Sequence, residues 1–523
     1  MNFLNYKSTR KLLELAKNPY NLALSENLVR RIEEYKIETD ILIYSYALEK
    51  VDDKVLDALE DLARESCLVD KMIGMQKGQV VNYIENYVSD NRKVLHTAMR
   101  GWIDSSSYYF EIKEELEKAR KENERLENFI NEITNTNRFT NLIQIGIGGS
   151  SLGPKSLYMA LEKYKIPERN IYFISNVDPD NAASVLSKVD PKETLVVVVS
   201  KSGNTLETLT NEIFVENVFL NSGCLTKDHF IMVTGENSSV NNPEKYLEIF
   251  YIWDYVGGRF SSTSMVGGVV LSFAFGYNIF KEILQGANDM DKHVLNPDFR
   301  SNVPLMLAMI GIWNRNFLNY PTVAVLPYAE CLGDFIAHLQ QCDMESNGKH
   351  IDKKGNFVTF STGPVIWGEP GTNSQHSFYQ LLHQGTDIIP IEFIGFKNNQ
   401  YNFDLSIQGT TSQEKLLSNL FAQAIALAKG LYNDNPNKRF EGNRPSCCLL
   451  YNQLNPYTLG SLLSLYEHKI VFQGFCWGIN SFDQEGVQLG KDLSNLLLEI
   501  YKNEKSFKDF PEGYSFIRLL DYL

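Results

Sequence analysis

The sequence predicts an α/β protein with two doubly wound parallel sheets, a helical region at the N-terminus and a helical tail at the C-terminus. Three observations indicate this fold. The chain has 523 residues, more than one core usually holds, so two lobes are expected. Short apolar segments alternate with helical stretches in two series, which is typical of parallel sheets covered by helices. The composition, 43% hydrophobic and 22% charged, is that of a globular protein.

The first half of the chain contains the helical region and the first series of strands. Apolar residues at helical spacing predict helices through residues 8–100, including the segment 42–62. The pattern changes after Arg138. Four strands are then predicted, at residues 141–147, 171–176, 194–200 and 229–235.

The second series follows an uncharged segment at residues 261–280. That segment is long enough to raise the question of a membrane span, but its Ser, Thr, Asn and Gly residues favour a buried helix over 264–280. Strands are predicted at residues 322–328, 364–367, 388–396, 447–452 and 469–475. Helices are predicted at residues 332–342, 374–384, 412–430 and 456–467.

These patterns divide the chain into three regions. Residues 1–100 form the helical region, which we expect to pack on the large domain. Residues 101–280 form the first α/β domain. Residues 281–523 form the second α/β domain together with the helical tail.

The charge and the cysteines indicate a cytoplasmic protein without nucleic-acid or membrane partners. The net charge is -14, whereas nucleic acids and anionic membranes attract positively charged surfaces. Seven cysteines form no C-x-x-C pair, which favours reduced thiols. The first 21 residues carry charges among their apolar positions and so lack the apolar core of a signal peptide.

Two turns between a predicted strand and a helix are suited to an anion. The first, GIGGSS at residues 146–151, has glycines that permit close approach of a ligand to the backbone. It is not a dinucleotide fingerprint, because Ser151 stands where the third glycine would be, and no ATP-binding G-K-[ST] follows. The second, SKSGNT at residues 200–205, offers three hydroxyls and an ammonium, which suit a phosphate monoester. Alternatively, its hydroxyls only cap the helix.

Together with further sequence motifs, these two turns resemble a known enzyme family. GIGGSSLGP and SKSGNTLET are similar to the first half of the sugar-isomerase (SIS) family, so both sheets are expected to be of the SIS type. The ordered set, which spans residues 145–491, resembles the phosphoglucose isomerase family. Its other blocks are VGGRFS at 256–261, QCDMESNGK at 341–349, WGEPGTNSQH at 367–376 and FDQEGVQLGK at 482–491.

The resemblance implies a reaction and a role for each matching residue. The family interconverts glucose 6-phosphate and fructose 6-phosphate through a cis-enediol, a step of glycolysis and gluconeogenesis, without metal or cofactor. Glu345 matches the catalytic base, His376 the ring-opening histidine, Lys491 the lysine beside the sugar ring and Arg259 the arginine over the reacting carbons. The residues that match substrate-binding positions are Gly149, Ser150, Ser200, Lys201, Ser202, Thr205, Glu207, Gln341 and Gln484.

These residue types suit the chemistry. Imidazole titrates near neutral pH, and a single carboxylate can carry a proton between adjacent carbons while a cation stabilises the enediolate. The resemblance also implies a homodimer with shared sites, in which His376 enters the pocket that holds Glu345 of the other subunit.

Some residues depart from the family pattern, and other interpretations stay open. Glu485 stands where the family usually has Trp, Gln488 where it has Glu, and Ser374 where it often has Gly. Taken alone, Glu345 and His376 could be structural residues. His376 and His383 could form a metal pair, although a core histidine is favoured because no third ligand shares their spacing.

Two other functions are compatible with parts of the pattern. A non-catalytic SIS-type sugar-phosphate sensor would need the 200–205 turn, but it has no use for Glu345, His376 and Lys491 together. An isomerase that also accepts mannose 6-phosphate would carry the same motifs.

Overall fold

The computed structural model describes residues 3–104, 110–502 and 508–520. It divides into two compact units, residues 1–481 and 482–523, which are described separately. None of the helices within these described residues is long and apolar enough to cross a membrane. The uncharged segment instead contains α11 (Met265–Phe275), whose residues are all buried. The predicted helix over 264–280 is interrupted at Gly276, which has a φ of 89°, and a second helix begins at Tyr277.

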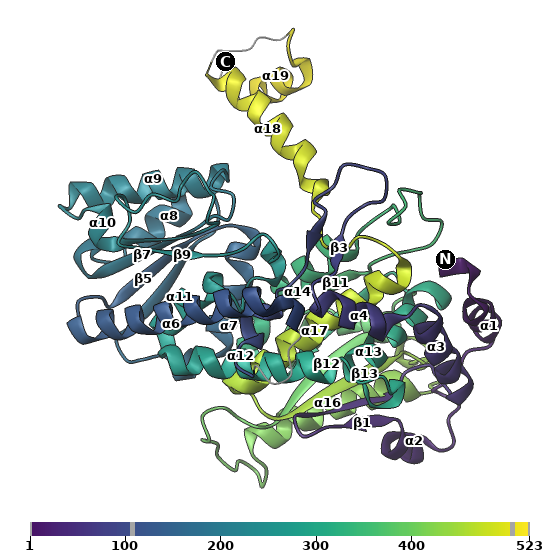
Figure 1. The fold of residues 1–523 in the computed structure, drawn as a ribbon. Helices are drawn as coiled ribbons and strands as arrows, with labels where there is room; N and C mark the ends of the chain where they lie inside the picture. The colour runs from purple at the N-terminus through teal and green to yellow at the C-terminus, as the bar shows by residue number, and fades with distance from the viewer. Residues whose placement is uncertain (1–2, 105–109, 503–507, 521–523) are drawn as a thin grey trace. The chain divides into compact units, whose positions relative to one another are not determined.

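The first sheet consists of five parallel strands in the order β6-β5-β7-β8-β9. Helices cover both of its faces, with α8, α9 and α10 on one side and α6, α7 and α11 on the other (Figure 1). The predicted doubly wound arrangement is therefore confirmed, although β9 was not foreseen. The strands are β5 (Asn141–Ile145), β6 (Asn170–Ile174), β7 (Thr194–Val199), β8 (Phe230–Thr234) and β9 (Glu248–Tyr251), and the helices are α6 (Lys113–Thr136), α7 (Leu152–Ala160), α8 (Pro179–Leu186), α9 (Leu206–Asn221) and α10 (Thr226–His229).

The second sheet has six strands in the order β1-β2-β13-β12-β10-β11. The four strands β13, β12, β10 and β11 are parallel, whereas β2 and β1 extend the sheet in antiparallel pairing. The bounds are β1 (Lys36–Glu38), β2 (Leu42–Leu48), β10 (Thr322–Pro327), β11 (Val365–Trp367), β12 (Ile391–Asn398) and β13 (Ser446–Gln453).

The prediction of a helix from residue 42 was wrong, because residues 42–48 form β2. Leu42, Tyr44 and Tyr46 are buried while Ile43 is 38% exposed, which is the two-residue period of a strand with one face on the core. Apolar residues are dense enough here to fit a helical period as well. Pairing with β13 decides between the two structures.

A single long helix, α17 (Pro456–Trp477), replaces the predicted helix at 456–467 and strand at 469–475. The strand prediction failed because α17 is apolar and buried almost throughout, so no polar face reveals the helical period. Successive residues of β12 face opposite sides of the sheet. Phe393 packs in one core with Leu420 of α16 (Ser412–Lys429), while Glu392 pairs with Lys469 of α17 at 2.6 Å.

The remaining helices of the first unit pack around these layers. The predicted helix at 332–342 corresponds to α14 (Gly333–Gln340) followed by a π-helical turn (Gln341–Glu345), and the one at 374–384 to a 3₁₀ turn (Asn373–His376) followed by α15 (Tyr379–Gln384). Others are α1 (Lys7–Leu15), α2 (Leu28–Glu34), α3 (Asp53–Glu65), α4 (Leu68–Gln76), α5 (Ala98–Gly101) and α13 (Val303–Ile312), and β3 (Val80–Asn82) pairs with β4 (Arg92–Lys93).

The second unit contains the predicted helical tail, formed by α18 (Gln488–Tyr501) and α19 (Pro511–Arg518). Most of α18 is exposed within this unit, with Ile500 as its buried residue.

Helices α12 (Tyr277–His293) and α17 cross at backbone contact. A Cβ atom on Gly286 would lie 1.8 Å from the carbonyl oxygen of Tyr457, and one on Gly460 would lie 1.9 Å from that of Ile283. Each helix therefore presents a glycine to the backbone of the other. Because α11 leads directly into α12 and α17 covers the second sheet, this crossing joins the two layered halves of the first unit.

We expect Gly286→Ala to lower the free energy of unfolding by about 2 kcal/mol, because the added methyl must force the two helices apart. Helix propensity alone would favour alanine at this position. Thermal unfolding monitored by circular dichroism measures the change. The control is Gln285→Ala, an exposed neighbour on α12 that should stay within about 0.5 kcal/mol of the native protein. Equal stability of the two variants would contradict the close crossing.

Candidate active site

The glycine turn after β5 is pressed against two other segments of the site. A Cβ on Gly149 would lie 2.2 Å from the carbonyl oxygen of Gly258, the residue before Arg259. Gly148 has a φ of 56°, and a Cβ there would lie 3.1 Å from Nε2 of Gln341. Side chains larger than hydrogen would therefore separate these segments. Ser150 follows in the same turn and is half-buried.

The hydroxyl-rich turn after β7 leads into α9 and is held partly by its own side chains. Ser200 accepts a hydrogen bond from the backbone N–H of Gly203 at 3.2 Å, and Ser202 accepts one from Asn204 at 3.3 Å. Thr205 is the N-cap residue of α9, but its side chain makes no capping hydrogen bond. The interpretation that these hydroxyls only cap the helix therefore does not hold for Thr205.

Lys201 ties this turn to the arginine segment. Its Nζ donates to the carbonyl oxygen of Val256 at 3.1 Å. Burial lowers the pKa of Lys201, and Asp254 partly opposes the shift. Glu207 lies in the first turn of α9 and is half-buried.

Arg259 is 2% exposed and its guanidinium makes directed contacts with neighbouring residues. Nη1 pairs with Oε1 of Glu345 at 3.1 Å and Nε donates to the hydroxyl of Ser346 at 2.7 Å. Nη2 donates to the carbonyl oxygen of Ser481 at 2.6 Å. Because a guanidinium is planar with fixed donor directions, these contacts orient the group relative to the carboxylate.

Glu345 ends the π-helical turn, a feature that often marks functional sites. Its side chain is 21% exposed, which leaves the carboxylate accessible beside the buried Arg259. The turn is fixed at Asn347, which donates to the carbonyl oxygen of Ile470 and accepts from the hydroxyl of Ser481. Gln341, at the start of the turn, has a buried Oε1 without a hydrogen-bond partner among the described protein residues.

The structure thus brings together four of the predicted residues, Gly149, Arg259, Gln341 and Glu345, and links the 200–205 turn to them through Lys201. The sequence reasoning missed Ser346 and Ser481, which orient Arg259. Ser346 lies inside the QCDMESNGK block, directly after Glu345, but a serine gives no signal of its own.

His376 stands apart from this group. It ends the 3₁₀ turn after β11 and is exposed, and its side chain makes no hydrogen bond or ion pair with the described residues. Its neighbour Gln375 fixes the turn by donating to the hydroxyl of Tyr328 at 2.8 Å. His383 bonds to Gln423 and packs against Phe440, which favours the structural interpretation of this histidine.

Gln484 and Lys491 belong to the second unit, where both are exposed. Gln484 precedes a 3₁₀ turn (Glu485–Val487), and Lys491 lies in the first turn of α18. Their approach to the substrate stays a prediction. Among residues 3–104, 110–502 and 508–520, no group of three or more His, Cys, Asp or Glu side chains could hold a metal ion.

Known proteins match this chain along nearly its whole length. The family model of phosphoglucose isomerase matches residues 45–514. The glucose-6-phosphate isomerase of Chlamydia pneumoniae is 54% identical over 520 residues, 99% of this chain and 98% of the relative. The protein of the same name from Protochlamydia amoebophila is 51% identical and covers 100% of this chain and 98% of its own.

A solved structure agrees with these sequence matches. The crystal structure of a glucose-6-phosphate isomerase from Chlamydia trachomatis D/UW-3/Cx superposes with a TM-score of 0.95 at 50% identity, covering 100% of this chain and 99% of that one. With its two α/β sheets, the glycine and hydroxyl-rich turns and the Arg259–Glu345 pair in place, the chain belongs to the phosphoglucose isomerase family.

Proposed function

We propose that this protein interconverts glucose 6-phosphate and fructose 6-phosphate, with Glu345 as the base that moves a proton between C2 and C1. The observation that carries the proposal is the 3.1 Å pair between Arg259 and an accessible Glu345. A full catalytic apparatus of this kind is not needed by a sugar-phosphate sensor. The reversible reaction would serve both glycolysis and gluconeogenesis.

The phosphate of the substrate would lie at the 200–205 turn, and the reacting carbons at Glu345. Free N–H groups at the start of α9, the hydroxyl of Thr205 and the ammonium of Lys201 suit a phosphate monoester there. This arrangement separates binding from chemistry. The turn holds a part of the sugar that does not react, whereas Arg259 and Glu345 meet the part that does.

In the reaction, Glu345 takes the proton from C2, and negative charge develops on the enediolate oxygens. Arg259 lies beside the carboxylate with its orientation already fixed, so its charge stabilises the enediolate without reorganisation. Glu345 then returns the proton to C1. Before this step, His376 would open the sugar ring, with Lys491 beside that ring. Three further residues would line the pocket: Gln341, Gln484 and Glu207.

We further propose that the enzyme is a cytoplasmic homodimer whose sites are shared between subunits. His376 supports this, because its exposed ring has no side-chain partner among the described residues of its own chain. All seven cysteines lie in described residues and are free, which supports a reducing compartment.

Glu345→Gln is expected to lower kcat by about a thousandfold with little change in substrate binding, because an amide cannot take the C2 proton. The measurements are coupled turnover of fructose 6-phosphate and exchange of the C2 hydrogen with solvent. Glu282→Gln, an exposed change on α12, is the control and should keep native activity. Native-rate exchange in Glu345→Gln would show that Glu345 is not the base.

The double variant Ser200→Ala with Thr205→Ala is expected mainly to raise KM for fructose 6-phosphate. Some loss of kcat should follow, because binding of the phosphate helps to orient the sugar. Steady-state kinetics separate the two parameters. Thr210→Ala with Ser222→Ala, two exposed changes within α9 and at its C-cap, form the control. An unchanged KM in the first double variant would place the phosphate elsewhere.

The shared site predicts recovery of activity when two inactive variants are mixed. Glu345→Gln and His376→Ala homodimers are dissociated, combined and reassembled. If the two residues act across the interface, each heterodimer has one intact site, so with random pairing about a quarter of all sites recover. Heterodimer formation is checked by native mass spectrometry. Confirmed heterodimers without recovered turnover would contradict the shared site and leave the isomerase proposal intact.

A further inference from the structure

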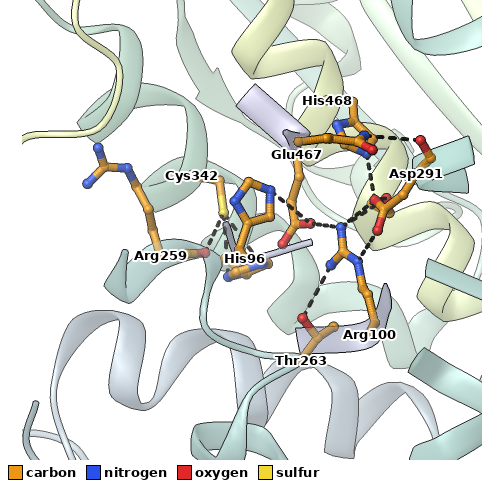
Figure 2. Close-up of polar contacts among 11 residues, drawn as sticks. His96, Arg100, Arg259, Thr263, Asp291, Cys342, Glu467 and His468 are labelled. Atoms are coloured by element: carbon orange, nitrogen blue, oxygen red, sulfur yellow. Dashed lines mark hydrogen bonds and ion pairs between the residues drawn. The ribbon is translucent and has the colours of Figure 1, made fainter. Parts of the chain in front are cut away.

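Five buried charged and aromatic side chains, here called the Arg100 cluster, lie beside the segment that carries Arg259 (Figure 2). Arg100 of α5 pairs with Asp291 of α12 through two contacts of 2.7 Å and with Glu467 of α17 at 2.8 Å. His468 of α17 bonds to Asp291 at 2.7 Å, and His96 completes the group. All five side chains are at most 1% exposed.

The cluster is costly to bury, so stability alone does not explain it. Buried ion pairs are often no more stable than apolar residues of the same volume. Burial would raise the pKa of Asp291, but Arg100 and His468 together more than offset this and the pKa is lowered. For Glu467 burial prevails and the pKa is raised. The cluster therefore stabilises the charged form of Asp291, whereas burial disfavours the charged form of Glu467.

Two members of the cluster touch the segment 258–264 that contains Arg259. The ring of His96 stacks on Phe260, with centroids 4.8 Å apart and planes at 19°. Arg100 donates from Nη1 to the hydroxyl of Thr263 at 3.3 Å. Both contacts are therefore made just after Arg259 in the chain, one at the next residue and one four residues later.

A contact from outside the cluster reaches the backbone of Arg259 itself. The thiol of Cys342, in the π-helical turn, donates to the backbone carbonyl of Arg259 at 3.2 Å. Figure 2 shows the guanidinium of Arg259 extending away from the cluster, while its backbone carbonyl lies on the cluster side. The cluster therefore supports the backbone of this segment, and the opposite side of the segment presents the guanidinium to Glu345.

His96 contributes a flat neutral ring to this support. Burial, with Arg100 second, lowers its pKa well below the ordinary value. Neither ring nitrogen has a hydrogen-bond partner in the described part of the chain, and Nε2 lies 3.9 Å from the carboxylate of Glu467, beyond hydrogen-bond range. The ring is therefore placed to act through its stacking on Phe260 rather than through proton transfer.

We propose that His96 and Arg100 are positioning residues, which hold the segment 258–264 so that the Arg259 guanidinium meets Glu345 in the geometry that the isomerisation requires. The inference rests on the proposed function. A displacement of about 1 Å at a reacting group can cost about a hundredfold in rate, so a fixed backbone beneath Arg259 matters directly for turnover.

The test compares His96→Ala with His96→Phe. Removal of the ring should lower kcat about tenfold or more while KM for fructose 6-phosphate changes less than about twofold, because the phosphate is held at the 200–205 turn. Phenylalanine keeps a flat ring against Phe260, and the substitution breaks no hydrogen bond with the described residues. His96→Phe should therefore retain at least half of the native kcat. Steady-state kinetics and the thermal midpoint are measured for each variant.

The matched control is His229→Ala, which removes another buried histidine, one that packs between Phe139 and Phe219 in the first α/β layer. It should lower the thermal midpoint but leave kcat of the folded protein unchanged. A second variant, Thr263→Val, removes the hydroxyl that Arg100 contacts and leaves the ion pairs intact. It should lower kcat about three- to tenfold and serves as the deciding variant if His96→Ala does not fold.

The outcomes separate this inference from the proposed function. Absence of isomerase turnover in the native protein overturns both. If the native protein does turn over substrate, the positioning role alone is overturned by a native kcat in His96→Ala. It is also overturned if the kcat of His96→Phe is no higher than that of His96→Ala. Where His96→Ala does not fold, a native kcat in Thr263→Val overturns it.

Discussion

The backbone contact between α12 and α17 is the constraint on which the rest of the first unit depends. Gly286 and Gly460 allow two buried helices to meet at their carbonyl groups, a distance that no other residue permits. About one to two turns further along the same pair, Asp291 and Glu467 share Arg100. A charge cluster of this kind requires that its donors and acceptors stay at hydrogen-bond distance, which helices separated by ordinary side chains would not provide.

The active-site geometry follows from this crossing. α17 contributes Glu467 to the Arg100 cluster and Lys469 to the pair with Glu392 on the second sheet, so side chains two residues apart fix the orientation of the helix on different sides. The same helix supplies the carbonyl oxygen of Ile470 that receives Asn347. The π-helical turn with Glu345 is therefore fixed by α17, and the segment with Arg259 by the residues that α12 and α17 hold.

Much of the fold could be predicted from the sequence where local patterns and tertiary contacts agree. The parallel strands β5, β7, β8, β10 and β12 are short apolar runs followed by turns, and each was located. The errors fall where burial removes the pattern. α17 is buried on all sides and shows no helical period, and β2 depends on pairing with β13, a strand 400 residues away in the chain. A single sequence carries no signal for such a partner.

Only the site residues that lie in recognisable sequence motifs could be predicted. Gly149, Arg259, Gln341 and Glu345 lie in blocks that resemble a known family, and the structure brings them together. Ser346 and Ser481 were not predicted, because they act by accepting hydrogen bonds that orient Arg259. Many residue types could accept such bonds, so a serine at these positions gives no signal. The Arg100 cluster was not predicted for a similar reason, since its members are spread over α5, α12, α17 and the segment before α5. The division of the chain at residue 280 stays a prediction.

The contact between Gly149 and Gly258 limits how the specificity of this protein can evolve. The two loops already meet through their backbones, with 2.2 Å between the carbonyl oxygen of one and the place where a side chain on the other would begin. Substitution at this contact cannot bring the loops closer, and any larger residue breaks the site rather than reshaping it. Adaptation to a sugar phosphate of another size must therefore proceed through the residues around the loops, while the glycine pair keeps their separation constant across descendants of this sequence.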